Sequence, residues 1–108
     1  MAKKIKLVVD ANGVGIQGAF HPASAQLVAI GAGSLRSTVI SGVEVVRLVA
    51  SGNCHVKFSD QSTVTAVAAT DMYLAAYIPE YFSLKGDTYI AVIRDGAAVG
   101  WLCITPME

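Results

Sequence analysis

Charged residues are scarce in this chain, and their scarcity narrows the classes of protein it can belong to. Asp, Glu, Lys and Arg make up 15% of the 108 residues, against about 25% in an average soluble domain. Disordered chains combine high charge with low hydrophobicity, and an apolar content of 54% excludes that class. A small domain with so few charges cannot cover its surface with them. We therefore expect some apolar surface to meet another copy, in a dimer or trimer.

Clustered positive charge is also lacking. Eight basic and eight acidic residues balance to a formal net charge of zero. Nucleic-acid binding needs clustered Lys and Arg, so no nucleic-acid partner is expected. The one basic cluster is Lys3, Lys4 and Lys6. It predicts a short N-terminal arm over residues 1–6, which is either a solvated tail or a contact to an acidic partner.

No apolar run is long enough to cross a membrane as a helix, which takes about 18 residues. The longest candidate, residues 38–51, is interrupted by Glu44 and Arg47. Near the start, only residues 7–9 form a continuous apolar run, which is too short for a signal peptide. We therefore expect a protein that is made in the cytoplasm and has no membrane partner.

Cysteine and histidine are rare as well. Cys54 and Cys103 lie in apolar, strand-like surroundings, and without a secretion signal they are expected to be buried free thiols. Cys54 and His55 are neighbours in a predicted strand, so they point to opposite faces and cannot share one metal ion. The Gly-rich segment 31–34 lacks the Gly-Lys-Ser/Thr ending of a phosphate-binding loop, and no Gly-x-Ser-x-Gly motif occurs. The sequence therefore predicts no enzyme, no metal site and no cofactor.

The chain does contain a series of short segments rich in Val, Ile, Thr and aromatic residues. They recur roughly every 8–12 residues between turn-forming residues, which is typical of an antiparallel sandwich or barrel. We expect one domain over residues 1–108, an all-β antiparallel β-sandwich of jelly-roll type. Asn12-Gly13 and Asp95-Gly96 predict hairpins. The predicted strands are 4–10, 14–20, 26–30, 37–40, 43–50, 54–58, 72–77, 80–84, 89–94 and 99–105, with 63–69 either a strand or an extended loop.

Two of these segments also predict which side of a strand faces the core. Residues 43–50 are apolar on both alternating sides, which indicates an inner strand or a strand whose outer side meets a partner. Residues 54–58 alternate between apolar and polar side chains instead. Their expected inward side chains are Cys54, Val56 and Phe58, and their expected outward side chains are His55 and Lys57.

The tyrosines and the only tryptophan gather in the last third of the chain. Tyr73, Tyr77 and Tyr81 are candidate contacts to a protein partner, together with the three N-terminal lysines. Tyr and Trp also serve in cores and in stacking platforms for sugars or bases, and the residue pattern leaves these alternatives open. Trp101 is expected to be buried, so that Trp101→Ala costs about 3–5 kcal/mol of stability.

Four segments resemble a pattern in small virion proteins of tailed bacteriophages. They are VRLVASGNCHVKF at 46–58, DMYL at 71–74, PEYF at 79–82 and IAVI at 90–93. In the pattern, a strand pair that contains VRL and a later V-x-F precedes an aromatic segment ending in P-E-Y-F, and two strands follow. The resemblance covers residues 45–107. It departs from the pattern at Ala75, where proline is usual.

Some of these proteins resemble capsid cement or decoration proteins, which are jelly-roll sandwiches bound to the phage head as dimers or other oligomers. The resemblance thus implies a non-enzymatic structural protein on the capsid surface of the virion, made in the host bacterial cytoplasm. Its implied partners are the major capsid protein and further copies of itself. Two alternatives remain: a neck or tail component of the virion, and a small carbohydrate-binding β-sandwich that uses its Tyr and Trp residues.

Overall fold

The computed structural model describes residues 22–108, and within this range the chain forms eight strands and no helix. Several predictions concern residues before this range. The strands at 4–10 and 14–20, the turn at Asn12-Gly13 and the arm over residues 1–6 with Lys3, Lys4 and Lys6 all lie outside the described residues.

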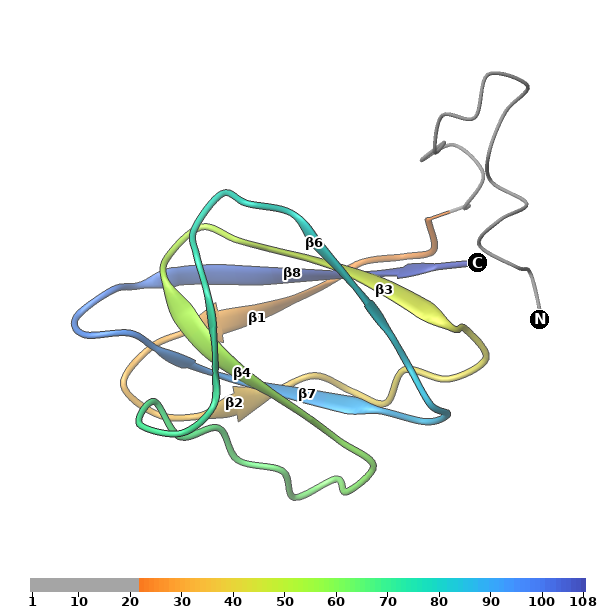
Figure 1. Cartoon of the computed structure of the whole chain (residues 1–108), viewed down its shortest axis with the longest axis horizontal. Coiled ribbons are helices and arrows are strands. Elements are labelled where there is room, and N and C mark those ends of the chain that lie inside the picture. The colour runs from red at the N-terminus through yellow and green to blue at the C-terminus, as the bar shows by residue number, and fades with distance from the viewer. Residues whose placement is uncertain (1–21) are drawn as a thin grey trace.

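The strands form two four-stranded antiparallel sheets that pack against each other (Figure 1). The first sheet has the strand order β1-β8-β3-β6, and the second sheet has the order β2-β7-β4-β5. The all-β antiparallel sandwich predicted from the sequence is therefore confirmed. The strands are β1 (Gln26–Ile30), β2 (Leu35–Arg36), β3 (Val45–Ala50), β4 (Cys54–Ser59), β5 (Met72–Leu74), β6 (Glu80–Ser83), β7 (Tyr89–Arg94) and β8 (Gly100–Met107).

The strands pair from the outside of the described sequence inward. The first pairs with the last, β1 with β8, and the pairs β2–β7, β3–β6 and β4–β5 follow. Two further pairs, β3–β8 and β4–β7, join these into the two sheets. As a result β7 and β8 lie in different sheets, and the hairpin predicted at Asp95-Gly96 is wrong. These residues form a turn that carries the chain from one sheet to the other.

The hydrophobic core lies between the two sheets and follows from the alternation of side chains along each strand. Val46, Leu48 and Ala50 of β3 are at most 2% exposed, and their side chains face the second sheet. The predicted inward residues of β4 behave as expected, because Cys54 and Val56 are buried and Phe58 packs against the core. Burial of these apolar side chains supplies most of the driving force for folding.

The segments predicted as strands at 37–40 and 63–69 are not continuous strands. Ser37 exchanges hydrogen bonds with Ile90, in which the Ser37 amide donates to the Ile90 carbonyl at 2.9 Å and the Ser37 hydroxyl accepts from the Ile90 amide at 3.0 Å. Further along, Ile40 forms an isolated bridge with Thr88. Residues 63–69 form a loop with a turn at each end, so of the two predicted alternatives the strand is wrong and the loop holds.

Candidate interaction surface

The two sheets differ in what covers their outer faces. The outer face of the second sheet is covered by the connection over residues 60–71, which Figure 1 shows in green. Val64 and Ala66 of this connection form a small buried cluster with Ala91 of β7. The connection is held in place by the Ala66 amide, which donates to the Ser34 hydroxyl at 2.9 Å. The chain itself therefore covers the part of this face around Ala91, whereas Tyr73 of β5 stays 49% exposed.

The outer face of the first sheet carries exposed apolar side chains. Leu27 is 62% exposed, Trp101 54% and Tyr81 40%. Because side chains alternate along a strand, these residues lie on the opposite side from the buried Val28, Leu102 and Leu48. We call this surface the open face. It consists of Leu27, Ala29, Arg47, Val49, Tyr81, Trp101, Cys103 and Thr105.

The pairing register arranges the open face into rows across neighbouring strands. Leu27 lies opposite Cys103, which lies opposite Val49, so that one apolar row crosses three strands. A second row joins Thr105, Arg47 and Tyr81. Neighbouring strands are about 4.8 Å apart, so side chains in a row touch and form one continuous patch.

Arg47 is the only charged residue of the open face. Isolated exposed apolar residues are normal on soluble proteins, but a contiguous apolar patch indicates a surface that meets another molecule. The structure explains why residues 43–50 are apolar on both sides. Val46 and Leu48 face the core, and Val49 lies on the open face. The structure places β3 between β8 and β6, which is the first of the two predicted explanations, an inner strand; an outer side that meets a partner stays a prediction.

Trp101 belongs to the open face, and the expectation that it is buried is wrong. In β8 the alternation places Leu102 and Ile104 in the core at 0% exposure, which leaves Trp101 on the outer side. Its main chain is tied to the turn after β3. The Trp101 amide donates to the Ser51 hydroxyl at 2.8 Å, and the Ser51 amide donates to the Trp101 carbonyl at 2.9 Å. Trp101→Ala therefore removes surface contact area rather than core packing.

The three tyrosines predicted to contact a partner are not brought together. Tyr81 in β6 belongs to the open face, whereas Tyr73 in β5 belongs to the second sheet and packs edge-on against His55 at a ring distance of 5.6 Å. Tyr77 follows β5, and its amide donates to the Ala50 carbonyl at 2.7 Å beside the end of β3.

Leu27, Val49 and Cys103 lie on the open face but were not among the candidates predicted from the sequence. Their signal is an apolar residue at the position that alternates away from the core.

Tyr77 has an unusual backbone conformation for an exposed aromatic residue. Its φ is 64°, in the left-handed region, and it is 76% exposed. A residue with a Cβ atom pays about 1–2 kcal/mol in this region, where Gly and Asn are tolerated better. An exposed bulky residue kept in a strained position suggests that its side chain serves something other than stability.

Tyr77→Asn is expected to leave stability unchanged or to raise the free energy of unfolding by up to about 1 kcal/mol, because Asn adopts positive φ more readily than Tyr. Tyr81→Asn is the matched control. Tyr81 lies in a strand, where Asn is disfavoured by up to about 1 kcal/mol, so this change should lower stability. Urea denaturation of both variants measures the difference. Equal losses at the two positions would show that the conformation of Tyr77 is not strained.

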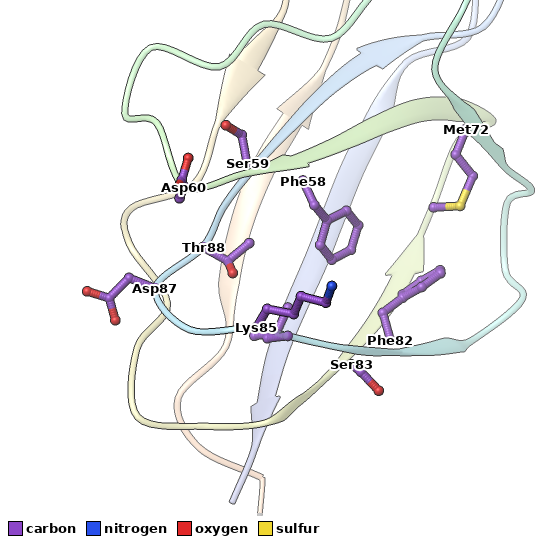
Figure 2. Close-up of a pocket in the computed structure, with 10 residues that line it drawn as sticks. Phe58, Ser59, Asp60, Met72, Phe82, Ser83, Lys85, Asp87 and Thr88 are labelled. Carbon is purple, nitrogen blue, oxygen red and sulfur yellow. The ribbon is translucent and has the colours of Figure 1, made fainter.

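A second surface feature is a cleft of about 650 Å³ at one edge of the sandwich (Figure 2). Figure 2 shows the Met72 and Phe82 side chains on one side of the cleft and the carboxylates of Asp60 and Asp87 on the other. The rings of Phe58 and Phe82 are 5.3 Å apart and inclined at 57° to each other. They do not form the flat aromatic platform on which a sugar ring stacks.

The groups able to do chemistry are few in the described part of the chain. No group of three or more His, Cys, Asp or Glu in residues 22–108 could hold a metal ion, and no helix there could span a membrane.

Cys54 and Cys103 are free thiols, as predicted, although Cys103 is only half-buried. Burial, helped by the charge of Asp95, raises the pKa of the Cys54 thiol to about 11. This thiol therefore stays protonated at neutral pH and is a poor nucleophile.

His55 is a titratable side chain held by two partners from distant parts of the chain. Its Nδ1 lies 2.9 Å from the carbonyl oxygen of Asp71, and its Nε2 lies 2.8 Å from Oδ1 of Asp95. The hydrogen bond to the Asp71 carbonyl and then the bond to Asp95 raise the pKa of His55 above its ordinary value, and partial burial opposes them. The outward orientation predicted for His55 is confirmed, and its ring joins two connections.

Comparison of the chain with protein-family models, with curated proteins and with solved structures found no match. The resemblance to phage virion proteins therefore depends on the four sequence segments alone.

Proposed function

We propose that this protein is a non-enzymatic structural protein of a tailed-phage virion, a decoration or cement protein of the head. In this role it binds between major capsid subunits on the capsid surface, after synthesis in the host cytoplasm. The observation that carries the proposal is the open face, an apolar patch over four strands with Arg47 as its only charge. Burial of such a patch against a capsid would stabilise the head against the pressure of packaged DNA.

The strand arrangement supports a jelly-roll description of the sandwich. A jelly roll wraps eight antiparallel strands into two four-stranded sheets. The strand orders β1-β8-β3-β6 and β2-β7-β4-β5, with the first strand paired to the last, fit such wrapping. This is the fold that the resemblance implies for a capsid decoration protein.

The size of the open face indicates how such a protein would bind. Four strands about 4.8 Å apart, each contributing about five residues at about 3.3 Å, give a flat area of roughly 300 Å². A standard interface buries about 800 Å² on each partner. Neighbouring exposed apolar residues, such as Ile78 and Val99, or residues of a second copy must therefore add to the contact. Self-association into a dimer or trimer with several contacts to a repeating lattice meets this need.

Two other functions compete with this proposal. A neck or tail component would use the same surface but would be present in a few or a dozen copies per particle instead of hundreds. A carbohydrate-binding module would need exposed coplanar aromatic rings. Tyr73 and Tyr81 lie on different sheets, and the Phe58 and Phe82 rings are inclined at 57°. Trp101 shares the open face with Tyr81 but lies in a different row, opposite Ala29, whereas Tyr81 lies opposite Arg47. These positions favour a protein partner over a sugar.

The deciding experiment combines light scattering with co-sedimentation. The purified protein is first sized alone, and is then mixed with phage heads assembled without it. A dimer or trimer that saturates the heads at hundreds of copies supports the proposal. Saturation at a dozen copies or fewer points to the neck or tail, and a monomer that does not sediment with heads contradicts the proposed function.

Leu27→Lys is expected to weaken binding to heads at least tenfold, because it places a charge at one end of an apolar row that binding would desolvate. Leu35→Lys is the matched control. Leu35 is also an exposed leucine on an edge strand, at 50% exposure, but it belongs to the second sheet. Both variants should unfold at nearly the wild-type temperature. Equal binding by the two variants would mean that the open face is not the surface that docks.

A further inference from the structure

The hydrogen bonds of His55 require a particular protonation state. The two atoms that face the ring nitrogens are a carbonyl oxygen of Asp71 and a carboxylate oxygen of Asp95. Both are acceptors, so each ring nitrogen must carry a proton to donate. A neutral imidazole has one N–H group and can make only one of these bonds. Both hydrogen bonds can therefore be made together only by the imidazolium form, since an imidazole is more basic than a carboxylate and takes the proton.

The charged and titratable groups around the ring favour this cation. Asp95 forms an ion pair with His55 in which the side chain of His55 is only 12% exposed. From the 60–71 connection, the Asp71 carboxylate is engaged by the Val67 amide at 2.6 Å, and from β5 the Tyr73 ring packs edge-on. The cations nearby are Lys57, two residues along β4 on the same face, and Arg94 of β7, which alternates to the other face.

Asp95 is also linked to the open face, because the main chain runs from Asp95 into β8. The Asp95 amide donates to the Asn53 carbonyl at 3.0 Å, and the Ala98 amide donates to the Asp95 carbonyl at 3.1 Å. The chain then passes Val99 and enters β8 at Gly100, one residue before Trp101. His55 thus holds the start of the 95–99 connection, and Ser51 holds its end at Trp101.

We propose that His55 is a proton-dependent tie that positions the 95–99 connection and, through it, the Trp101 end of the open face. When His55 loses its proton, its ring can donate only one of these two hydrogen bonds, so the link between Asp71 and Asp95 is broken and this end of the face is released. The consequence for binding rests on the proposed function: the open face should hold its partner more weakly at high pH. The tie itself does not depend on that function.

The direction of the pH effect follows from linkage. The pKa of His55 is raised in the folded protein, so the tie stabilises the fold most at pH values below the ordinary imidazole value of about 6.5. The stabilisation is lost as the pH rises from there through the raised folded pKa. The protein should therefore unfold at a lower temperature on the alkaline side of this transition than on the acidic side.

The test follows His55 and Trp101 by NMR in the isolated protein between pH 5 and pH 9. Trp101 is the only tryptophan, so its indole N–H signal is unambiguous. We expect this signal to shift with the same midpoint as the His55 ring, and that midpoint to lie above 6.5. His21→Gln is the matched control, because it removes the other histidine and should leave the Trp101 curve unchanged.

Two variants separate the tie from general effects of pH. Asp95→Asn replaces the acceptor by an amide that can donate to a neutral ring nitrogen, so the bond no longer needs a second proton. The Trp101 shift should then disappear while the fold is kept. His55→Gln should also abolish it. Two results would overturn the proposal: a Trp101 signal that does not change as His55 titrates, or a His55 midpoint at or below 6.5. Both are measured in the wild-type protein, so they decide the question even if a variant fails to fold.

The NMR titration, combined with head binding at two pH values, distinguishes failure of this inference from failure of the proposed function. If the Trp101 signal follows His55 but the protein does not bind phage heads at any pH, the tie stands and the partner is a different one. If the protein binds heads equally at pH 6 and pH 9 while the Trp101 signal does not move, the tie is refuted and the proposed function stands.

Discussion

Leu48→Ala is expected to lower the free energy of unfolding by about 2–5 kcal/mol. Leu48 is 0% exposed in β3, the strand that lies between β8 and β6, and it is paired with Ile104 and Glu80. Its side chain is surrounded on all sides, so removing three carbon atoms leaves a cavity that neighbouring strands cannot close. Small domains are stable by about 5–15 kcal/mol, so this loss is a large share of the total.

Urea denaturation of Leu48→Ala measures this loss, and Val49→Ala is the matched control. Val49 is the next residue in the same strand, but its side chain lies on the half-buried outer side. Val49→Ala should therefore cost about 1 kcal/mol or less, because part of the removed surface was already in water. Similar losses at both positions would contradict the assignment of the inner and outer sides of β3.

Gly52→Ala is expected to destabilise the protein by about 1–3 kcal/mol or more, because the site has no room for a side chain. A Cβ atom on Gly52 would lie 2.3 Å from the carbonyl oxygen of Val99. The opposing atom belongs to the main chain and cannot rotate away, so the 95–99 connection would have to move. This change should also alter the fluorescence of Trp101, which is the second residue of the strand after that connection.

Gly33→Ala is the control for Gly52→Ala. A Cβ atom on Gly33 would meet nothing within 4 Å, and its φ is not positive. This substitution should leave the stability unchanged or raise it by up to about 1 kcal/mol, because Ala restricts the unfolded chain. Thermal unfolding followed by circular dichroism compares the two. If the Gly52→Ala and Gly33→Ala variants unfold at the same temperature, the carbonyl oxygen of Val99 lies farther from Gly52 than the structure places it.

Most of the strands were predictable because local composition and alternation are properties of the sequence itself. The segments 26–30 and 89–94 coincide with β1 and β7, and β4 extends one residue beyond its predicted end. The inward side chains of β4 were predictable for the same reason, since alternation with period two is fixed by strand geometry. The segments that failed, such as 37–40, run beside a neighbouring strand but make only scattered bonds with it.

The interaction surface was predictable only in part. The double-sided apolar pattern of residues 43–50 indicated either an inner strand or an outer side that meets a partner. The structure shows that β3 is an inner strand of its sheet and that Val49 on its outer side is only half-buried. The tyrosines predicted the surface less well, because aromatic residues occur in surfaces and cores alike. Of the three candidate tyrosines, only Tyr81 lies on the open face. Trp101 was placed in the core on its size, although its alternation with Leu102 puts it outside.

By itself, the sequence determined the all-β class, the approximate strands and the low charge that leaves apolar surface to be covered, because these depend on residue types and on spacing along the chain. The tertiary structure alone decided which strands are neighbours. Turn residues such as Asp95-Gly96 show that the chain reverses but do not say into which sheet it continues. The tie between His55 and Asp95, 40 residues apart, and the row from Leu27 to Cys103 to Val49 both depend on that choice. Contacts between distant residues are selected by packing of the whole sandwich, which no local pattern encodes.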